Sequence, residues 1–374
     1  MTFDLTPDQD AFKTAVERFA GEQVAPQAAA IDETGAWPRA LRPAAAGLGL
    51  LGLTVPEAAG GAGRTAVDAV LAIEALARVS GSVALSVAIH NGLVADVVAR
   101  FGSDAQRRQW LGALARGEAI GAFALAEGEA GGDPARLATT AIPDGDGWRL
   151  RGRKVWVANA DAAGVVLVVA AGQEAGAAGV QAFLVPLEAA GVTRTPRDSV
   201  GLRGVGCADL DLDVRIGGDQ RLPRSAEAVA WAADGGRVLL AALALGLGQA
   251  ALDEAIAYGT RRQAFGRTVS SSQSFQWGLA DAATELDSAR LLTWKAAAER
   301  ARDAGTPIDA AMAKLHAAEA AHRAVDRAAQ ILSSSGYGRG SVIDRLCRDV
   351  RGVEIAQGTA DLQRMAIAAA MLPA

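Results

Sequence analysis

The chain has 374 residues, with 37 Lys and Arg against 42 Asp and Glu and a hydrophobic fraction of 51%. This length allows about two or three folding units, and this hydrophobic fraction can fill a sizeable core, so we expect a folded globular protein. Charges of both signs are scattered through the chain rather than gathered in blocks. The sequence therefore lacks the basic footprint of a protein that binds nucleic acid.

Targeting and metal signals are absent from the sequence. The segment 1–10 is acidic and lacks the basic region and apolar core of a signal peptide, and no uncharged apolar run of about 18 residues follows it. We therefore expect a cytoplasmic protein with no membrane partner. Cys207 and Cys347 have no CxxC partner, and His90, His316 and His322 are isolated. We expect neither a disulfide framework nor a metal site.

Helix signals dominate the first third of the chain. Thr6, Pro7 and Gln9 form a helix start, with a capping hydroxyl, a proline at the first helical position and a glutamine three residues after the threonine. A helix from about residue 7 to 20 is expected. Apolar residues then recur at spacings of three and four up to about residue 117. We predict an N-terminal helical domain over 1–118.

The pattern changes to short β-rich runs in the middle of the chain. The runs cover 120–125, 148–157, 165–169 and 180–185, and turn residues separate them. Segment 209–214 alternates strictly between Asp and an apolar residue, as a half-buried strand should. We predict a small antiparallel β-domain, a barrel or sandwich, over 119–222.

Helical periodicity returns after about residue 225. Long helical stretches cover 226–258, 273–304, 310–334 and 342–356, and predict a C-terminal domain like a four-helix bundle over 223–374. Segment 246–251 (GLGQAA) has the letters of a dinucleotide-binding loop, but it lies inside a continuous helix with no strand before it, so close helix packing explains its glycines better. The predicted fold class is mainly α with a small β-domain.

Eight segments in order and spacing carry a resemblance that covers nearly the whole chain. They are PEAAGGAG (56–63), FGS (101–103), LAEGEAGGD (125–133), KVWVAN (154–159), RQAFG (262–266), Gln273, Arg348-Asp349 and QGTADLQR (357–364). Together they resemble the acyl-CoA dehydrogenase family. The resemblance implies FAD as cofactor, an acyl-CoA or acyl-carrier thioester as substrate, an electron-transfer flavoprotein or similar acceptor, and a tetramer. In this family a carboxylate takes the α-proton while a hydride passes from the β-carbon to the flavin.

The resemblance places the catalytic base at position 357, where this chain has Gln357 instead of Glu. Some members carry the Glu just before the Arg that opens the first long bundle helix, and here that residue is Gly236, ahead of Arg237. An amide cannot accept the proton, and loss of a general base costs about 10² to 10⁴ in rate. Asp234 and Glu127 are the nearest candidates for a displaced base, although a structural hydrogen-bonding role explains each more simply.

The resemblance also indicates a depleted flavin-ring site. Ala126, Gly132 and Ala158 stand where the family has Thr, Ser and Thr. At about 1 kcal/mol for each hydrogen bond, losing two or three would weaken FAD binding by about 10-fold to 100-fold. Trp156 is expected on the cofactor side, and the alternative is a tryptophan packed inside the β-domain. Gly132, with Asp234 and Arg237, is expected to face the substrate.

The contacts that reach the FAD of a neighbouring subunit in the family are better kept. Arg262 is expected to pair with the pyrophosphate and Phe265 to cover the cofactor. The adenosine-side positions match at Gln273, Gln330 and Thr359, but Asp361 stands where Gln or Glu is usual, and Ser333 and Ser334 replace paired glycines. The match is therefore stronger on the cross-subunit side than on the ring side.

Three functions remain open from the sequence. The first is the base-lacking subunit of a heteromeric acyl-CoA dehydrogenase, in which a paralogous chain shares a composite FAD site. The second is a self-sufficient acyl-CoA dehydrogenase with a displaced base. The third is a different flavin-dependent reaction, or acyl-thioester binding without turnover, on the same scaffold. Either a homotetramer or a heterotetramer is compatible with these readings.

Overall fold

The computed structural model describes residues 4–172 and 179–372. The N-terminal part is helical, and Thr6 begins α1 as predicted, because its hydroxyl accepts a hydrogen bond from the Gln9 N–H while the Gln9 side chain accepts one from the Thr6 N–H. The helices of this part are α1 (Pro7–Phe19), α2 (Ala28–Thr34), α3 (Leu41–Gly47), α4 (Ala66–Ala77), α5 (Gly81–Ala88), α6 (Asp96–Phe101) and α7 (Asp104–Ala115), with a π-helical segment η4 (Ile89–Ala95) between α5 and α6.

A seven-stranded sheet follows, in the order β1-β4-β2-β3-β7-β6, with β5 paired to β4. The strands are β1 (Gly121–Ala124), β2 (Thr140–Asp144), β3 (Gly147–Val157), β4 (Val165–Gly172), β5 (Val180–Pro186), β6 (Val192–Pro196) and β7 (Ala208–Gly217). The prediction of a purely antiparallel sheet is wrong, because β4 pairs in parallel with both β1 and β2. The chain between β1 and β4 passes through β2 and β3, which is long enough for the crossover that a parallel pair needs.

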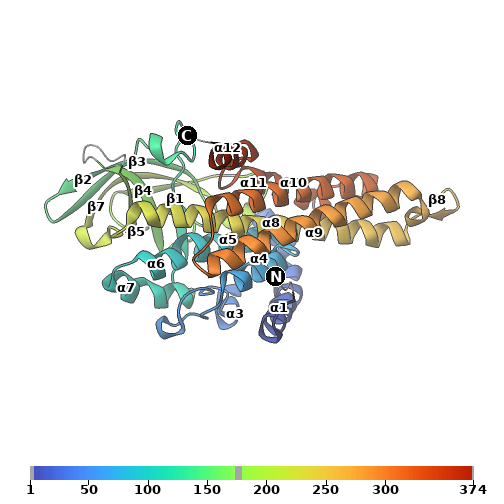
Figure 1. Cartoon of the computed structure of the whole chain (residues 1–374), viewed down its shortest axis with the longest axis horizontal. Helices are drawn as coiled ribbons and strands as arrows, with labels where there is room; N and C mark the ends of the chain where they lie inside the picture. Colours follow the sequence, from blue (N-terminus) through green and yellow to red (C-terminus); the bar gives the residue numbers. More distant parts are fainter. Residues whose placement is uncertain (1–3, 173–178, 373–374) are drawn as a thin grey trace.

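Long helices form the last part of the chain and extend into an arm (Figure 1). They are α8 (Ser225–Arg261), α9 (Gln273–Ala301), α10 (Pro307–Leu332), α11 (Val342–Ile355) and α12 (Ala360–Met371). The helix α12 was not among the predicted stretches. A short hairpin of β8 (Gln263–Ala264) and β9 (Arg267–Thr268) lies at the tip of the arm, between α8 and α9. The predicted fold class is confirmed, while the domain boundaries at 118 and 222 stay a prediction, and the outermost residues of the first and last predicted domains lie outside the described residues.

The glycines of segment 246–251 serve helix packing, as expected. A Cβ at Gly246 would lie 2.4 Å from the carbonyl oxygen of Glu74 in α4, and one at Gly248 would lie 2.6 Å from Leu286 Cδ2 in α9. Real Cβ atoms do not approach other atoms so closely, so each glycine allows α8 to contact a neighbouring helix. Both residues lie in the middle of α8, and neither begins a helix as a phosphate-binding loop would.

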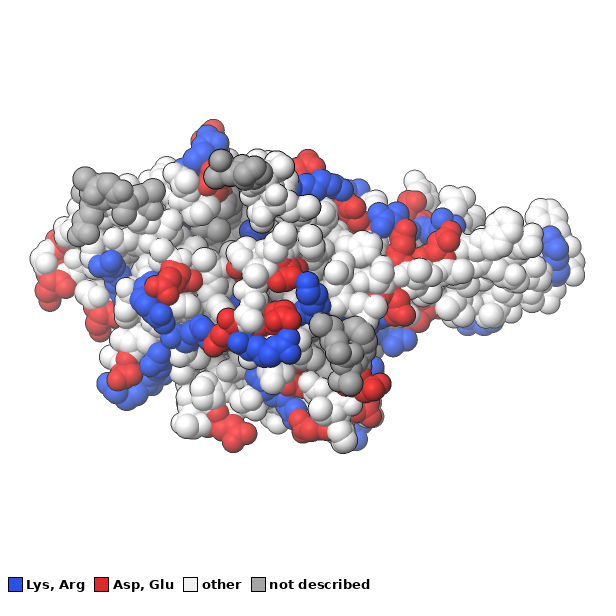
Figure 2. Space-filling view, in the orientation of Figure 1, with Lys and Arg blue, Asp and Glu red and all other residues white. Residues whose placement is uncertain are grey.

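Two helical stretches, Gly81–Phe101 and Ser225–Arg261, are long and apolar enough to cross a membrane by length and composition alone. Both are largely buried by the rest of the protein, which is the usual situation of a core helix. On the face shown in Figure 2, acidic and basic side chains are interspersed over the body of the molecule, with no field of a single sign. That distribution agrees with the scattered charges of the sequence.

Candidate functional site

The two positions at which the sequence led us to look for a base lie at one place. Gly236 belongs to α8, and Gln357 lies in the loop between α11 and α12. A Cβ at Gly236 would lie 3.2 Å from both Cδ and Oε1 of Gln357, and 3.1 Å from Cδ1 of Leu93 in η4. The π-helical geometry of η4 is a feature that often occurs at functional sites. At the point where α8, η4 and this loop meet, the side chain is the amide of Gln357, whereas the resemblance predicts the carboxylate of a glutamate.

The carboxylates that flank these two positions along the chain are each held by an arginine. The pairs are Asp234 with Arg237 at 2.7 Å, Glu354 with Arg351 at 2.6 Å and Asp361 with Arg364 at 3.5 Å. Burial raises the pKa of Asp234 above its ordinary value, against the opposing charges of Arg237 and Arg300. For Asp234 the effect of burial therefore outweighs the pairing with Arg237.

A buried lysine and a buried glutamine fix the loop that carries Gln357. Lys314 Nζ, from α10, donates to the carbonyl oxygens of Glu354 at 2.8 Å and Gly358 at 2.6 Å. Gln363 Nε2, from α12, donates to the carbonyl oxygens of Gln357 at 3.0 Å and Gly358 at 3.1 Å. Burial lowers the pKa of Lys314 to about 8, and the charge of Glu354 opposes that effect. The two donors hold a loop in which Gln357 and Gly358 both have positive φ.

Sequence reasoning missed Lys314 and Gln363. The available signal was a lysine in the alanine-rich stripe of α10, because a fully buried lysine needs a partner and here finds backbone carbonyls. Gln363 gave no comparable signal, since it lies in α12, which the sequence did not reveal. Both side chains are almost completely buried.

The residues predicted at the flavin ring lie side by side. The N–H of Val155 donates to the carbonyl oxygen of Ala126 at 2.9 Å, which joins the Ala126 segment to the end of β3, where Trp156 lies and after which Ala158 follows. Trp156 has φ 54° and is 52% exposed, with the Arg197 guanidinium 5.4 Å from its ring centroid. The alternative of a tryptophan packed inside the β-domain is therefore wrong. An exposed aromatic surface beside two alanines fits a planar ring system, while the individual cofactor contacts stay a prediction.

Gly132 lies in open space beside this segment. It is exposed, and a Cβ added there would meet no atom within 4 Å. The missing serine of the family pattern therefore leaves no cavity inside this chain. Its predicted role, to face the substrate, stays a prediction.

Glu127 has a structural role. Its carboxylate is buried and accepts hydrogen bonds from Lys154 Nζ at 2.6 Å and from the N–H groups of Ala138 at 2.6 Å and Thr139 at 3.1 Å. Burial alone would raise the pKa of Glu127, but these hydrogen bonds and the charge of Lys154 hold it below its ordinary value. Glu127 is therefore held in a buried ion pair that fixes the segment before β2.

Of the residues predicted to reach a neighbouring FAD, those in and beside the β8–β9 hairpin lie far from the ring segment. Arg262 ends α8, Phe265 is fully exposed with φ 51° in the turn of the β8–β9 hairpin, and Gln273 begins α9. Figure 1 places this hairpin at the end of the molecule opposite β2 and β3. Gln330, near the end of α10, and Thr359 with Asp361, at the start of α12, are exposed. One chain does not bring the hairpin residues and Trp156 together.

A cavity of about 340 Å³ lies where β4 and β5 meet the first turn of α8. Its lining includes the side chains of Gln181, Arg221, Arg224 and Glu227. Glu227 accepts a hydrogen bond from Arg224 at 3.1 Å. Of the two arginines in this lining, Arg221 therefore has no ion pair with another described residue. The first turn of α8 lies about 15 Å along the helix axis from Gly236, at 1.5 Å for each residue.

Comparisons with known proteins agree over the whole length of the chain. Family models for the N-terminal, middle and C-terminal domains of acyl-CoA dehydrogenases match residues 6–118, 122–214 and 226–372. The chain is 38% identical to the probable acyl-CoA dehydrogenase YngJ of Bacillus subtilis, with 100% of both chains covered, and 39% identical to the human mitochondrial short-chain specific acyl-CoA dehydrogenase, with 95% of this chain and 87% of that protein covered. The structure of butyryl-CoA dehydrogenase from Megasphaera elsdenii superposes with a TM-score of 0.95 at 30% identity over 100% of both chains.

Proposed function

Because this chain belongs to the acyl-CoA dehydrogenase family, whose enzymes are FAD-dependent oxidoreductases, we propose that it is the base-lacking subunit of a heteromeric acyl-CoA dehydrogenase. The observation that carries this proposal is the meeting of Gly236 and Gln357 at one point. A carboxylate at either position would face the same place, and this chain has one at neither. The nearby carboxylates Asp234, Glu354 and Asp361 are tied to arginines.

The residues of this chain would still bind and orient a thioester. Bound FAD supplies the acceptor for the hydride that leaves the β-carbon. Trp156 and the backbone around Ala126 would form a surface for the flavin ring. Lys314 fixes the loop that carries Gln357 through its hydrogen bond to the carbonyl oxygen of Gly358. The Gln357 amide can donate and accept hydrogen bonds, but it cannot keep the α-proton. Binding is therefore retained while proton removal is lost.

The cavity at the start of α8 offers a place for the polar part of a coenzyme A thioester. Arg221 supplies positive charge beside the N-terminal turn of α8, while Arg224 is paired with Glu227, and the charge and the helix start both favour phosphate groups. The distance of about 15 Å to Gly236 suits an extended arm between a nucleotide and a thioester. Acyl-CoA and an acyl-carrier thioester share such an arm, so this cavity does not select between them.

The separation of the hairpin from the ring segment supports a shared FAD. Arg262 and Phe265 are exposed at the tip of the arm, apart from the ring segment of their own chain, so a cofactor that they contact would be held mainly by another chain, either a second copy or a paralogue. We therefore propose that this chain completes the FAD site of a paralogous partner that carries the base, within a tetramer. An electron-transfer flavoprotein is the proposed electron acceptor of the assembly.

A self-sufficient dehydrogenase with a displaced base is the second candidate. Asp234 is its best residue, since burial raises its pKa, but Asp234 is two residues from Gly236 and so projects from α8 about 200° away from it. A different flavin-dependent reaction on this fold is the third candidate. Both predict that the chain purified alone is yellow and binds FAD in a homomeric assembly.

The visible spectrum and native mass of the chain distinguish these candidates. We expect the chain alone to hold little FAD, and to become yellow and tetrameric when it is co-expressed with an acyl-CoA dehydrogenase paralogue from the same genome. Phe265→Ala should lower the FAD content of the mixed assembly, whereas Arg267→Ala, a change at another exposed residue of the same hairpin, should have less effect. A yellow homotetramer formed by the lone chain would refute the shared-site proposal.

A further inference from the structure

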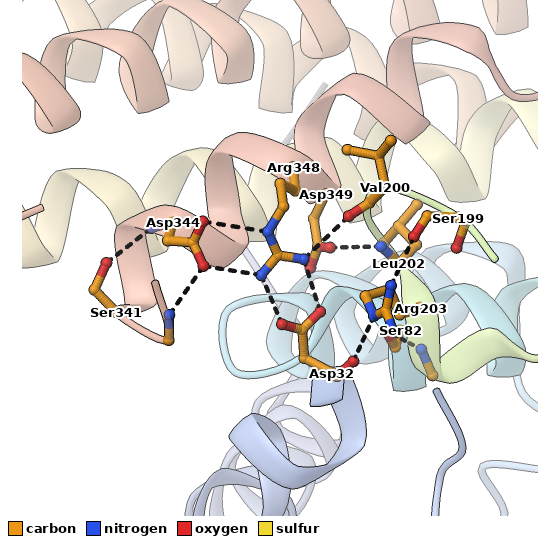
Figure 3. A network of polar contacts seen from close by, with 12 residues as sticks. Asp32, Ser82, Ser199, Val200, Leu202, Arg203, Ser341, Asp344, Arg348 and Asp349 are labelled. Carbon is orange, nitrogen blue, oxygen red and sulfur yellow. Dashed lines mark hydrogen bonds and ion pairs between the residues drawn. The ribbon is translucent and has the colours of Figure 1, made fainter. Parts of the chain in front are cut away.

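A segment between β6 and β7, residues 198–206, lies at a junction of three parts of the chain (Figure 3). Arg203 Nε donates to the carbonyl oxygen of Asp32 in α2 at 2.8 Å, and the N–H of Gly204 donates to Ser82 Oγ in α5 at 3.1 Å. The N–H of Leu202 donates to Asp349 Oδ1 in α11 at 2.5 Å. We call residues 198–206 the junction segment.

Leu202 fits closely into this junction in an unusual backbone conformation. It is buried, and its φ of 53° is one that a leucine rarely adopts without support from its surroundings. A Cβ at Gly352 would lie 2.7 Å from Leu202 Cδ1, and one at Gly81 would lie 2.9 Å from Leu202 Cδ2. The Leu202 side chain packs against these two glycines, which have no side chains of their own. We call the space formed by Gly81 and Gly352 the socket of Leu202. The strained conformation is therefore maintained by the socket and by the hydrogen bond to Asp349.

Asp349 is 1% exposed, and its second oxygen, Oδ2, has no hydrogen-bond partner among the described residues. Three charged groups influence it: Asp32 from α2, and Arg345 and Arg348 from its own helix. Arg348 is itself bound to Asp32 at 2.6 Å and to Asp344 at 3.1 Å. The other charged groups of the junction, Arg203 and Asp198, pair with each other, and α5 and α8 contribute apolar or uncharged groups.

The ionisation of Asp349 changes near neutral pH. Burial raises the pKa of its carboxyl to about 7, the hydrogen bond from Leu202 opposes this effect, and the charge of Asp32 adds to it. Ionised Asp349 is a desolvated charge with one unpaired oxygen, and local opening would let water reach it. Opening of the junction is therefore easier when Asp349 is ionised than when it is protonated.

The junction segment joins the two sides of the candidate site. The N–H of Asn159 donates to the carbonyl oxygen of Val205 at 3.1 Å, and Asn159 lies in the turn that follows β3, the strand that carries Trp156. On the other side, Asp349 lies in α11, which ends two residues before Gln357. Contacts with the junction segment thus set the ring surface at Trp156 relative to the loop at Gln357.

We propose that Asp349 is a positioning residue, which holds the junction segment through Leu202, and that this hold loosens as the solution becomes more alkaline through neutral pH. Loosening frees the Asn159 turn relative to the Gln357 loop. The carboxyl acts through Leu202 and Val205 and touches no reacting atom. The assignment of Trp156 to the flavin rests on the proposed function, but the hold on the junction segment does not.

Hydrogen exchange of the full chain at pH 6, 7 and 8, corrected for intrinsic rates, tests this proposal. Linkage between a pKa of about 7 in the closed state and an ordinary aspartate pKa in the open state predicts that the opening constant of residues 198–206 rises up to about ten-fold from pH 6 to pH 8. Asp349→Asn should abolish this dependence on pH. Asp344→Asn is the matched control, because it removes a carboxylate from Arg348 without contacting Leu202, and it should keep the dependence.

A second variant keeps the test valid if Asp349→Asn does not fold. Leu202→Gly accepts the same backbone conformation and removes the side chain from its socket, so it should raise exchange of residues 198–206 at every pH while the dependence on pH remains. An opening constant in the wild type that does not change from pH 6 to pH 8 would overturn the proposal. So would an Asp349→Asn variant with the wild-type trend. Neither result needs FAD or turnover, so neither bears on the proposed function.

Discussion

Replacement of Gln357 by a glutamate tests the proposed lack of a base separately from the proposed weakness of the flavin-ring site. The change is nearly isosteric, and Lys314 and Gln363 hold the loop through its backbone, so the introduced carboxylate should occupy the place of the amide. Lys314 and Arg237, which are close enough to influence each other, would favour the ionised form of the new carboxylate. Restoring a general base is worth about 10² to 10⁴ in rate.

We nevertheless expect little acyl-CoA-dependent dye reduction by Gln357→Glu in the isolated chain at stoichiometric FAD. In the proposed ring site Ala126 and Ala158 supply no hydroxyl, and two missing hydrogen bonds at about 1 kcal/mol each would weaken the FAD complex by about 10-fold to 100-fold. Addition of Ala126→Thr and Ala158→Thr should lower the half-saturating FAD concentration by that factor. The triple variant should then turn over.

The assay is dye reduction as a function of FAD concentration, with two controls. Ala126→Thr with Ala158→Thr but with Gln357 retained should bind FAD more tightly without turnover, which separates binding from chemistry. Gln23→Glu, an exposed change of the same kind in the π-helical segment η1 (Ala20–Val24), should match the wild type. Robust turnover by Gln357→Glu alone at stoichiometric FAD would show that the argument about the flavin site is wrong.

Four further predictions concern residues whose surroundings are defined. Gly236→Glu alone should lower the free energy of unfolding by about 1–3 kcal/mol in chemical denaturation, because its Cβ would crowd Gln357, and Gln357→Gly should recover most of that loss. Ser333→Gly should raise the melting temperature, with a gain of about 1 kcal/mol, because Ser333 has φ 51° and ψ −133°. Lys314→Met should cost about 2–4 kcal/mol in denaturation, since two buried carbonyl groups lose their donor. The free energy of unfolding of the wild type minus that of Asp349→Asn should fall as pH rises from about 4 to 7, by at most about 1.4 kcal/mol per pH unit, because the folded state keeps its proton longer than the unfolded state.

Each of these has a contrasting result. Ser334→Gly should give no gain, because Ser334 is not among the residues with positive φ, and an equal gain there would remove the strain argument. Lys295→Met, at an exposed lysine paired with Asp309, should cost far less than Lys314→Met. A Gly236→Glu variant as stable as the wild type would mean that the Gln357 loop moves freely. A stability difference for Asp349→Asn that is flat in pH would mean that the carboxyl is hydrated in the folded state.

Local patterns predicted most of the fold because they depend on neighbouring residues. The helix start at Thr6 and the buried glycines of α8 are read from periodicity and capping chemistry, and the structure confirms both. The parallel pairing of β4 with β1 and β2 depends on how distant segments cross, which no local pattern records. The helix α12 begins shortly after Gln357, with Thr359 as its N-cap. This capping signal was present in the sequence, but the segment was interpreted only as a family motif and not as a helix start.

The site was predictable in its residues but not in its arrangement. Position 357 and position 236 were considered as alternatives, since only the resemblance connected them. Lys314 and Leu202 lie outside the segments that carry the resemblance, and Gln363 lies inside one without a role assigned to it. The roles of all three come from buried hydrogen bonds and close contacts across the chain. A pattern along the chain reveals a residue that reacts, whereas a residue that holds it becomes visible only through its partners.

The convergence of Gly236 and Gln357 changes what the two substitutions mean together. If the positions lay apart, the loss of one carboxylate would say nothing about the other, and a base could be displaced between them. Because a side chain at position 236 would contact Gln357, one carboxylate at this place would suffice, and this chain has none at either position. The surrounding structure is still specified in detail, since Lys314 and Gln363 remain buried and bonded to the loop. This chain thus keeps the structure around the site without a carboxylate in it. That combination favours the proposed assembly, in which this chain contributes the shape of the site and the cofactor contacts of the hairpin, and another chain contributes the base.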